Sequence, residues 1–154
     1  MNFRKVFVDG NVIIDIFEEK RPFHKYSVEA IRLLLLNKVE LLTSSDLITT
    51  IYYVLAKVDR KKAFSDIKKV IAIFEIAPFG KEEIETALSL MEKDKNFKDL
   101  EDTLQYVVAK KAGCDLILSN DKGFYSPDIK VLNTKEFLDF FKPTSNTPGE
   151  PNRK

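Results

Sequence analysis

An apolar run that ends on a single carboxylate opens the sequence. Residues 6–8 (Val-Phe-Val) lead directly into Asp9, and a polar turn at Gly10 and Asn11 precedes a second apolar run that starts at Val12. This pattern predicts a buried strand that ends at Asp9, followed closely by a helix. α/β proteins commonly place a functional site at such a strand end. Since an acid at the end of a buried strand needs a polar partner, Asp9 constrains both the fold and the chemistry.

Short apolar strands alternate with amphipathic helices along the rest of the chain. The further strands are expected at residues 40–43, 74–78, 115–119 and 129–132. The helices are expected at residues 12–19, 23–37, 47–57, 59–74, 81–93, 97–112 and 135–141. This alternation predicts an α/β fold, a three-layer α/β/α sandwich around a mostly parallel sheet of four or five strands. Gly113 is expected to end one helix as its C′ residue, and Thr134 is expected to cap the last.

Size and composition indicate one globular domain. The 154 residues and the hydrophobic content of 44% support a single core in residues 1–142, and the Pro-, Ser-, Asn- and Gly-rich residues 143–154 are expected to be a disordered tail. A net charge of +1 gives no argument for nucleic acid, although a local basic face can coexist with an acidic pocket. With no signal-peptide pattern and no apolar run of about 20 residues, we expect a cytoplasmic protein without membrane association.

Three segments place carboxylates where a parallel sheet would bring them together. Asp9 ends the first strand, and Asp121 follows the strand at 115–119. Asp99 and Asp102 share one face at the start of the preceding helix. Clustered carboxylates raise one another's pKa unless a cation neutralises them, and an all-oxygen ligand set favours Mg²⁺ or Mn²⁺ over Zn²⁺. Taken singly, each of two acids has an alternative interpretation that fits as well as a metal ligand: Asp99 as a helix cap and Asp121 as a turn residue.

Four segments in this order resemble the PIN-domain nucleases, the family that includes the toxin half of VapBC toxin–antitoxin pairs. They are residues 8–15, 48–55, 99–106 and 112–124. The resemblance implies a domain that gathers acids around Mg²⁺ or Mn²⁺ and cleaves RNA by metal-activated water, with an antitoxin protein as a partner. It also implies that the catalytic acids and metal ligands are Asp9, Asp102 and Asp121, with Asp99 as a further metal ligand.

The same resemblance assigns supporting roles to several polar residues. Asn11 matches the residue that supports the first acid, and Ser119 matches one that helps to order the last loop. Glu101 matches an additional acid found in one subgroup of the family, and Asn120 is grouped with these supporting residues.

The chain departs from the family at the second acid. Family members carry Glu or Asp where this chain has Thr50, which can hydrogen-bond a water but supplies no charge. Divalent binding should therefore weaken, unless Asp46, one helical turn earlier, substitutes for the missing acid. This departure leaves open a non-catalytic PIN-like module that binds RNA or protein. A phosphatase of the haloacid-dehalogenase type is disfavoured, because it needs a second Asp where Asn11 stands.

Two surfaces indicate partners. The basic residues of the helix at 59–74 form either a phosphate-facing surface for RNA or a solvated helix face; they are Arg60, Lys61, Lys62, Lys68 and Lys69. The apolar residues of the helices at 23–37 and 47–57 exceed what one short sheet can cover, which predicts a homodimer.

Overall fold

A computed structural model describes residues 3–141, so the tail expected at 143–154 lies outside the described residues. The described part forms five strands: β1 (Lys5–Val8), β2 (Glu40–Ser44), β3 (Glu75–Ala77), β4 (Leu116–Leu118) and β5 (Lys130–Leu132). It also forms seven helices: α1 (Gly10–Phe17), α2 (His24–Leu36), α3 (Leu47–Ala56), α4 (Arg60–Ile73), α5 (Lys81–Lys93), α6 (Leu100–Ala112) and α7 (Thr134–Phe141). Every predicted strand and helix is present, with ends that shift by a few residues.

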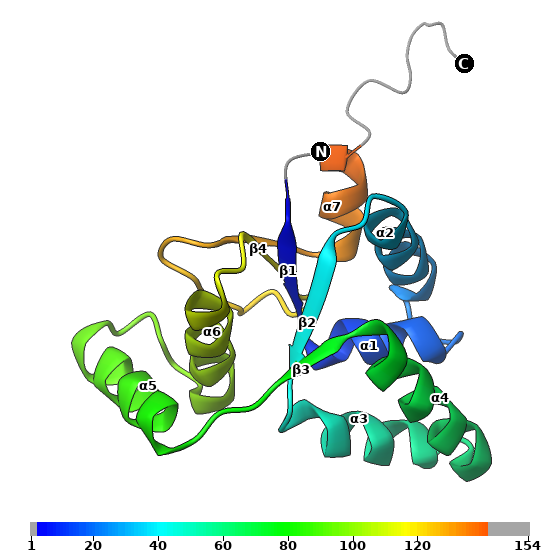
Figure 1. Cartoon of the computed structure of the whole chain (residues 1–154), viewed down its shortest axis with the longest axis horizontal. Helices are drawn as coiled ribbons and strands as arrows, with labels where there is room; N and C mark the ends of the chain where they lie inside the picture. Colours follow the sequence, from blue (N-terminus) through cyan, green and yellow to red (C-terminus); the bar gives the residue numbers. More distant parts are fainter. Residues whose placement is uncertain (1–2, 142–154) are drawn as a thin grey trace, which may run out of the picture.

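The five strands form one parallel sheet in the order β3-β2-β1-β4-β5. Helices α5 and α6 lie on one side of this sheet, and α1, α2, α4 and α7 lie on the other (Figure 1). The central strand β1 and its neighbour β4 are the most apolar, because both of their faces are covered: residues 6–8 and 116–118 are all fully buried. The predicted three-layer α/β/α sandwich is therefore confirmed, with five strands.

Local sequence signals account for several helix ends. Gly113 follows α6 with a φ of +79°, the left-handed conformation expected of a C′ glycine. The expected cap at Thr134 is wrong. Asn133 accepts a hydrogen bond from the Glu136 amide at 2.7 Å, and Glu136 accepts one from the Asn133 amide at 2.9 Å. This reciprocal capping box places Thr134 inside α7 and frees its hydroxyl for another partner.

The strand order places a crevice at the carboxyl ends of β1 and β4. From β1 the chain moves outward through β2 and β3, and it then returns to the other side of β1 with β4. Val8 pairs with Leu118, and the Asp9 amide donates a hydrogen bond to the Leu118 carbonyl at 2.9 Å. In open α/β sheets, ligands bind at such a topological switch point. In residues 3–141, no helix is both long and apolar enough to cross a membrane.

Candidate metal centre at the carboxyl edge of the sheet

A pocket of about 220 Å³ lies at this switch point and collects most of the residues singled out from the sequence. Four segments build it: the β1–α1 junction, the helix α3, the start of α6, and the loop after β4. Its lining residues are Asp9, Gly10, Asn11, Ile14, Leu47, Thr50, Asp99, Glu101, Asp102 and Asp121. We call it the acidic pocket. Of the predicted site residues, only Ser119 and Asn120 are not among those that line it.

Asp9 is the most buried acid of the pocket. Its Oδ1 accepts a hydrogen bond from the Gly10 amide at 2.7 Å, which also caps the N-terminus of α1. Its Oδ2 accepts two more, from Asn11 Nδ2 at 3.1 Å and from Ser119 Oγ at 2.8 Å. These three donors fix the orientation of the carboxylate. Asn11, expected to support the first acid, thus contacts Asp9 directly, and Ser119, expected to help order the last loop, contacts it as well.

The start of α6 supplies three further acids. Asp99 precedes the helix and accepts a hydrogen bond from the Glu101 amide at 3.3 Å, so it caps α6 and lines the pocket as well. Ligand oxygens of Asp99, Glu101 and Asp102 all lie within 4.8 Å of one another. The α6 N-terminus favours negative charge here, because the helix dipole presents its positive end.

Asp121 reaches the pocket from the loop that follows β4. Its amide donates to Ser119 Oγ at 3.1 Å, and its Oδ1 accepts from the Gly123 amide at 2.9 Å. Asp121 is therefore a turn residue, as the sequence allowed, and it lines the pocket as well. Its second carboxylate oxygen has no hydrogen bond from residues 3–141 and is available to a ligand.

Burial, and to a smaller extent mutual repulsion, raises the pKa values of three of these carboxyl groups. Burial raises the pKa of Asp9 to about 6, against the lowering effect of the hydrogen bonds from Ser119 and Gly10. Burial, together with the charges of Asp9, Asp99, Asp121 and Glu101, raises the pKa of Asp102 to about 7. Burial, followed by the charges of Asp46 and Asp99, raises the pKa of Glu101. At neutral pH, a nearby cation would stabilise the charged forms of these groups.

No basic side chain of residues 3–141 supplies that cation. The ion pairs of this part of the chain involve none of the five acids of the pocket. No group in the same range donates a hydrogen bond to the half-buried Asp102 carboxylate. The atoms that could ligate a metal here are carboxylate, amide and hydroxyl oxygens, which suit a hard divalent ion. The residues present therefore fit a bound divalent metal.

Thr50 stands at the wall of the acidic pocket, at the position where the resemblance to the PIN-domain nucleases implies an acid. Asp46 does not take over this position, because it is not among the pocket residues and its Oδ1 accepts a hydrogen bond from Ser44 Oγ at 2.6 Å. Its charge nevertheless acts on Glu101. The acids available to a metal are thus those of β1, α6 and the β4 loop.

One buried acid near the pocket received no role from the sequence. Asp15, on α1, is 4% exposed and accepts a hydrogen bond from Asn120 Nδ2 at 2.6 Å. The signal that could have found it is an acid inside the apolar stretch from Val12 to Phe17. Such an acid has to be paired within the fold.

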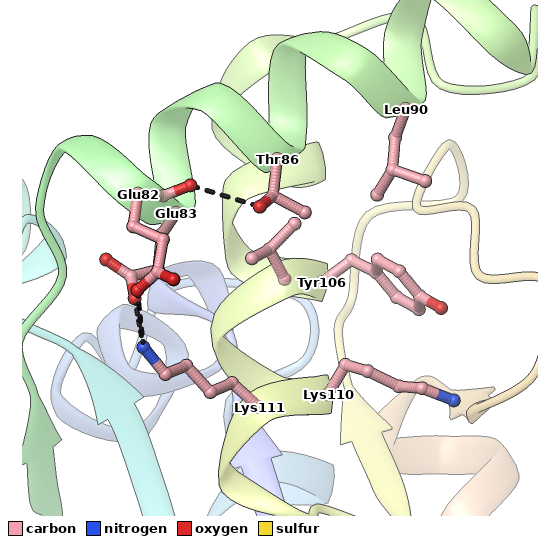
Figure 2. A pocket seen from close by; sticks show the side chains of 8 residues that line it. Glu82, Glu83, Thr86, Leu90, Tyr106, Lys110 and Lys111 are labelled. Atoms are coloured by element: carbon pink, nitrogen blue, oxygen red, sulfur yellow. Dashed lines mark hydrogen bonds and ion pairs between the residues drawn. The ribbon is translucent and has the colours of Figure 1, made fainter.

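A second hollow, of about 390 Å³, lies between α5 and α6 (Figure 2). The Lys111 ammonium contacts the Glu83 carboxylate at one end of it, and Thr86 Oγ1 donates to the Glu82 carbonyl at 3.0 Å. None of its lining residues lines the acidic pocket. The ion pair neutralises Glu83, so this hollow does not share the uncompensated charge of the acidic pocket.

The fold and the acidic pocket define a PIN domain. The family model for the PIN domain matches residues 6–130, and the chain belongs to this family. Over 139 residues it is 73% identical to Ribonuclease VapC1 of Aquifex aeolicus (strain VF5), a match that covers 90% of this chain and 96% of that protein.

Solved structures show the same fold at low sequence identity. VapBC2 from Rickettsia felis, bound to a promoter DNA fragment, superposes with a TM-score of 0.65 and 15% identity, covering 84% of this chain and 98% of that one. VapC20 from Mycobacterium tuberculosis, a toxin that cleaves the sarcin–ricin loop, gives a TM-score of 0.63 and 16% identity, covering 77% and 92%. The predicted resemblance to the PIN family is confirmed.

Proposed function

We propose that this protein is a divalent-metal-dependent endoribonuclease of the VapC type, the toxin of a toxin–antitoxin pair. The convergence of Asp9, Asp102 and Asp121 in one pocket without a basic partner carries this proposal. The 73% identity to Ribonuclease VapC1 supports the ribonuclease activity. The structural neighbours that are complexes of toxin and antitoxin support the biological setting.

In this proposal, Asp9, Asp102 and Asp121 hold the cation, with Asp99 as a further ligand and Mg²⁺ or Mn²⁺ as the ion. When bound, such an ion would supply an activated water and would stabilise the leaving oxygen of the phosphodiester. Asn11 and Ser119 hold the Asp9 carboxylate in place through their hydrogen bonds.

The remaining polar residues of the pocket have weaker roles. Glu101 adds negative charge at the start of α6 and is exposed enough to contact water or substrate. Thr50 offers a hydroxyl that can orient a water but cannot attract a metal by charge. The pocket accordingly relies on α6 for the charge that other members place on α3.

RNA binding needs positive charge near this acidic pocket. Lys98 lines a small hollow that shares Asp99 and Asp102 with the pocket, and Lys122 follows Asp121 directly. Both lysines are exposed and make no ion pair within residues 3–141. We assign them to the phosphates that flank the cleaved bond.

Protein partners have apolar surface available. The segment from α2 to α4 leaves large apolar side chains exposed, including Leu36, Tyr53 and Phe64 on the helices and Val58 in the turn between α3 and α4. We assign these exposed apolar side chains to protein contacts, with an antitoxin and with a second copy of the chain. We place this assembly in the cytoplasm, where its RNA substrate is found.

The test is cleavage of a single-stranded RNA by the purified chain with Mg²⁺, with Mn²⁺ and with EDTA. Asp9→Asn should reduce cleavage to background. Asp115→Asn is the matched control, because Asp115 lies just before β4 and is remote from the carboxyl edge. Cleavage that survives EDTA or Asp9→Asn would contradict the proposal.

A non-catalytic PIN-like module is the competing interpretation, and Thr50 is the observation that favours it. Titration calorimetry with Mn²⁺ separates the two. Binding in the micromolar to millimolar range together with cleavage supports the nuclease, whereas RNA or protein binding without metal binding supports the module.

A further inference from the structure

We propose that Asp15, which lies outside the acidic pocket, is a positioning residue for the metal ligands Asp9 and Asp121, and that it acts through Asn120. This inference rests on the proposed function, because it concerns the same metal centre. It assigns a task to a buried acid that the proposed chemistry does not use.

The two oxygens of Asp15 have separate partners. Arg21 Nε donates to Oδ1 at 2.5 Å, and Asn120 Nδ2 donates to Oδ2 at 2.6 Å. Asp15 is almost fully buried, whereas the Arg21 side chain is 38% exposed. Arg21 therefore compensates the negative charge of Asp15 from the solvent side. The second oxygen, Oδ2, binds Asn120 in the loop after β4.

Asn120 is the centre of this network, and every hydrogen-bonding position of its side chain is used. Besides Asp15, Nδ2 contacts Ser27 Oγ at 3.1 Å, and Oδ1 accepts from the Thr134 amide at 3.0 Å and from Thr134 Oγ1 at 3.1 Å. A flipped amide would turn its oxygen toward the Asp15 carboxylate and its NH₂ toward the Thr134 amide. The charge of Asp15 thus selects one orientation of Asn120.

The backbone of Asn120 passes this restraint to the metal ligands. Its amide donates to Asn11 Oδ1 at 3.0 Å, and Asn11 Nδ2 in turn donates to Asp9 Oδ2. The preceding Ser119 donates to the same oxygen of Asp9 and accepts from the Asp121 amide. Two of the three hydrogen bonds to Asp9, and the start of the Asp121 turn, therefore depend on the placement of residues 119–121.

A merely stabilising role can be separated from positioning, because the chain has a matched buried acid elsewhere. Asp66, on α4, is 2% exposed and accepts a hydrogen bond from Lys62 Nζ at 2.9 Å. No residue of α4 lines the acidic pocket. Asp66→Asn therefore removes a comparable buried ion pair without touching the network of Asn120.

The experiment compares Asp15→Asn with Asp66→Asn in two ways. Amide hydrogen exchange of the metal-free protein, followed by NMR, measures how well the amides of Asn120 and Asp121 are protected. Titration with Mn²⁺ measures the metal affinity of the centre. For Asp15→Asn we expect about tenfold faster exchange at both amides and about tenfold weaker Mn²⁺ binding, the size of a lost hydrogen bond to a charged group. For Asp66→Asn we expect a lower Tm with both quantities within about twofold of wild type.

A rescue variant tests the mechanism. In Asp15→Asn/Asn120→Asp the carboxamide at position 15 donates to the carboxylate at position 120, which still accepts from Thr134. This double variant should restore the protection of the Asp121 amide. If Asp15→Asn does not fold, Asn120→Ala, which keeps the pair of Asp15 and Arg21, is measured in the same way.

The positioning role would be overturned if Asp15→Asn left both the amide exchange rates and the Mn²⁺ affinity within about twofold of wild type, as expected for Asp66→Asn. A wild-type protein that binds Mn²⁺ without cleaving RNA would instead overturn the proposed function. The exchange measurement needs neither metal nor RNA, so it decides the role of Asp15 in either case.

Discussion

Ser119 Oγ donates a hydrogen bond to Asp9 Oδ2 at 2.8 Å, although the two residues are 110 positions apart in the chain. They meet because β1 and β4 are neighbours in the sheet and Val8 pairs with Leu118. One hydroxyl thereby joins the first acid of the candidate metal centre to the loop that carries Asp121.

Removing this hydroxyl should weaken the centre. In Ser119→Ala, Asp9 loses a hydrogen bond that lowers its pKa, so its pKa should rise above about 6 and Mn²⁺ should bind about tenfold more weakly at pH 7. Ser119→Thr keeps the hydroxyl and serves as the matched control. Calorimetric titration with Mn²⁺ checks both variants, and equal affinities for Ser119→Ala and wild type would refute the role of this hydrogen bond.

Metal removal should make stability fall as the pH rises from about 4 to about 7. The folded-state pKa values of Asp9 and Asp102, about 6 and about 7, exceed the unfolded value near 3.8, so the folded protein binds more protons in this window. The contribution of Asp9 and Asp102 to the free energy of unfolding is complete below about pH 4, and it is lost as the pH rises through their folded-state pKa values. For the buried Asp9 the loss is at most about 3 kcal/mol, and the half-exposed Asp102 adds less.

Urea unfolding in EDTA at several pH values measures this loss. Saturating Mn²⁺ should cancel or reverse the slope, because the metal binds the deprotonated carboxylates. Asp9→Asn should flatten the slope in EDTA. Stability that rises between pH 4 and 7 without metal would show that the acids are not perturbed in this way.

Restoring an acid at position 50 should strengthen metal binding. In Thr50→Glu a carboxylate enters the wall of the acidic pocket, so Mn²⁺ affinity should rise about tenfold while the metal-free protein becomes less stable. Thr49→Glu adds the same charge at an exposed neighbour that does not line the pocket. Calorimetry and RNA cleavage should respond to the first substitution only; equal effects of both would point to general charge instead.

Gly113 should matter for stability and not for the pocket. A Cβ at this position would meet no atom within 4 Å, so the cost of Gly113→Ala arises from the φ of +79° alone. We expect a loss of about 1 kcal/mol in thermal or urea unfolding, and a smaller loss for Gly113→Asn. Mn²⁺ affinity should stay unchanged, and an unaltered stability of Gly113→Ala would contradict the strain argument.

The sequence predicted the elements and most of the site because the relevant signals are local. Apolar runs mark β1 and β4, and helical periodicity marks α2 to α6. The order of four short segments pointed to the acids that line the pocket. The N-cap residue could not be assigned from the sequence where two polar residues are adjacent, as at Asn133 and Thr134. Either residue can act as the cap, and only the backbone conformation in the folded protein selects one.

By itself, the sequence determined the strand that ends at Asp9, the α/β class, and the acids able to serve a metal. Tertiary structure alone decided which polar groups meet: Ser119 at Asp9, and Asp15 at Asn120. Such hydrogen bonds join residues more than 100 positions apart, so they depend on strand order and register, which no local pattern encodes. Asp9, which ends the first strand, is thus held in place by partners that only the folded sheet brings to it.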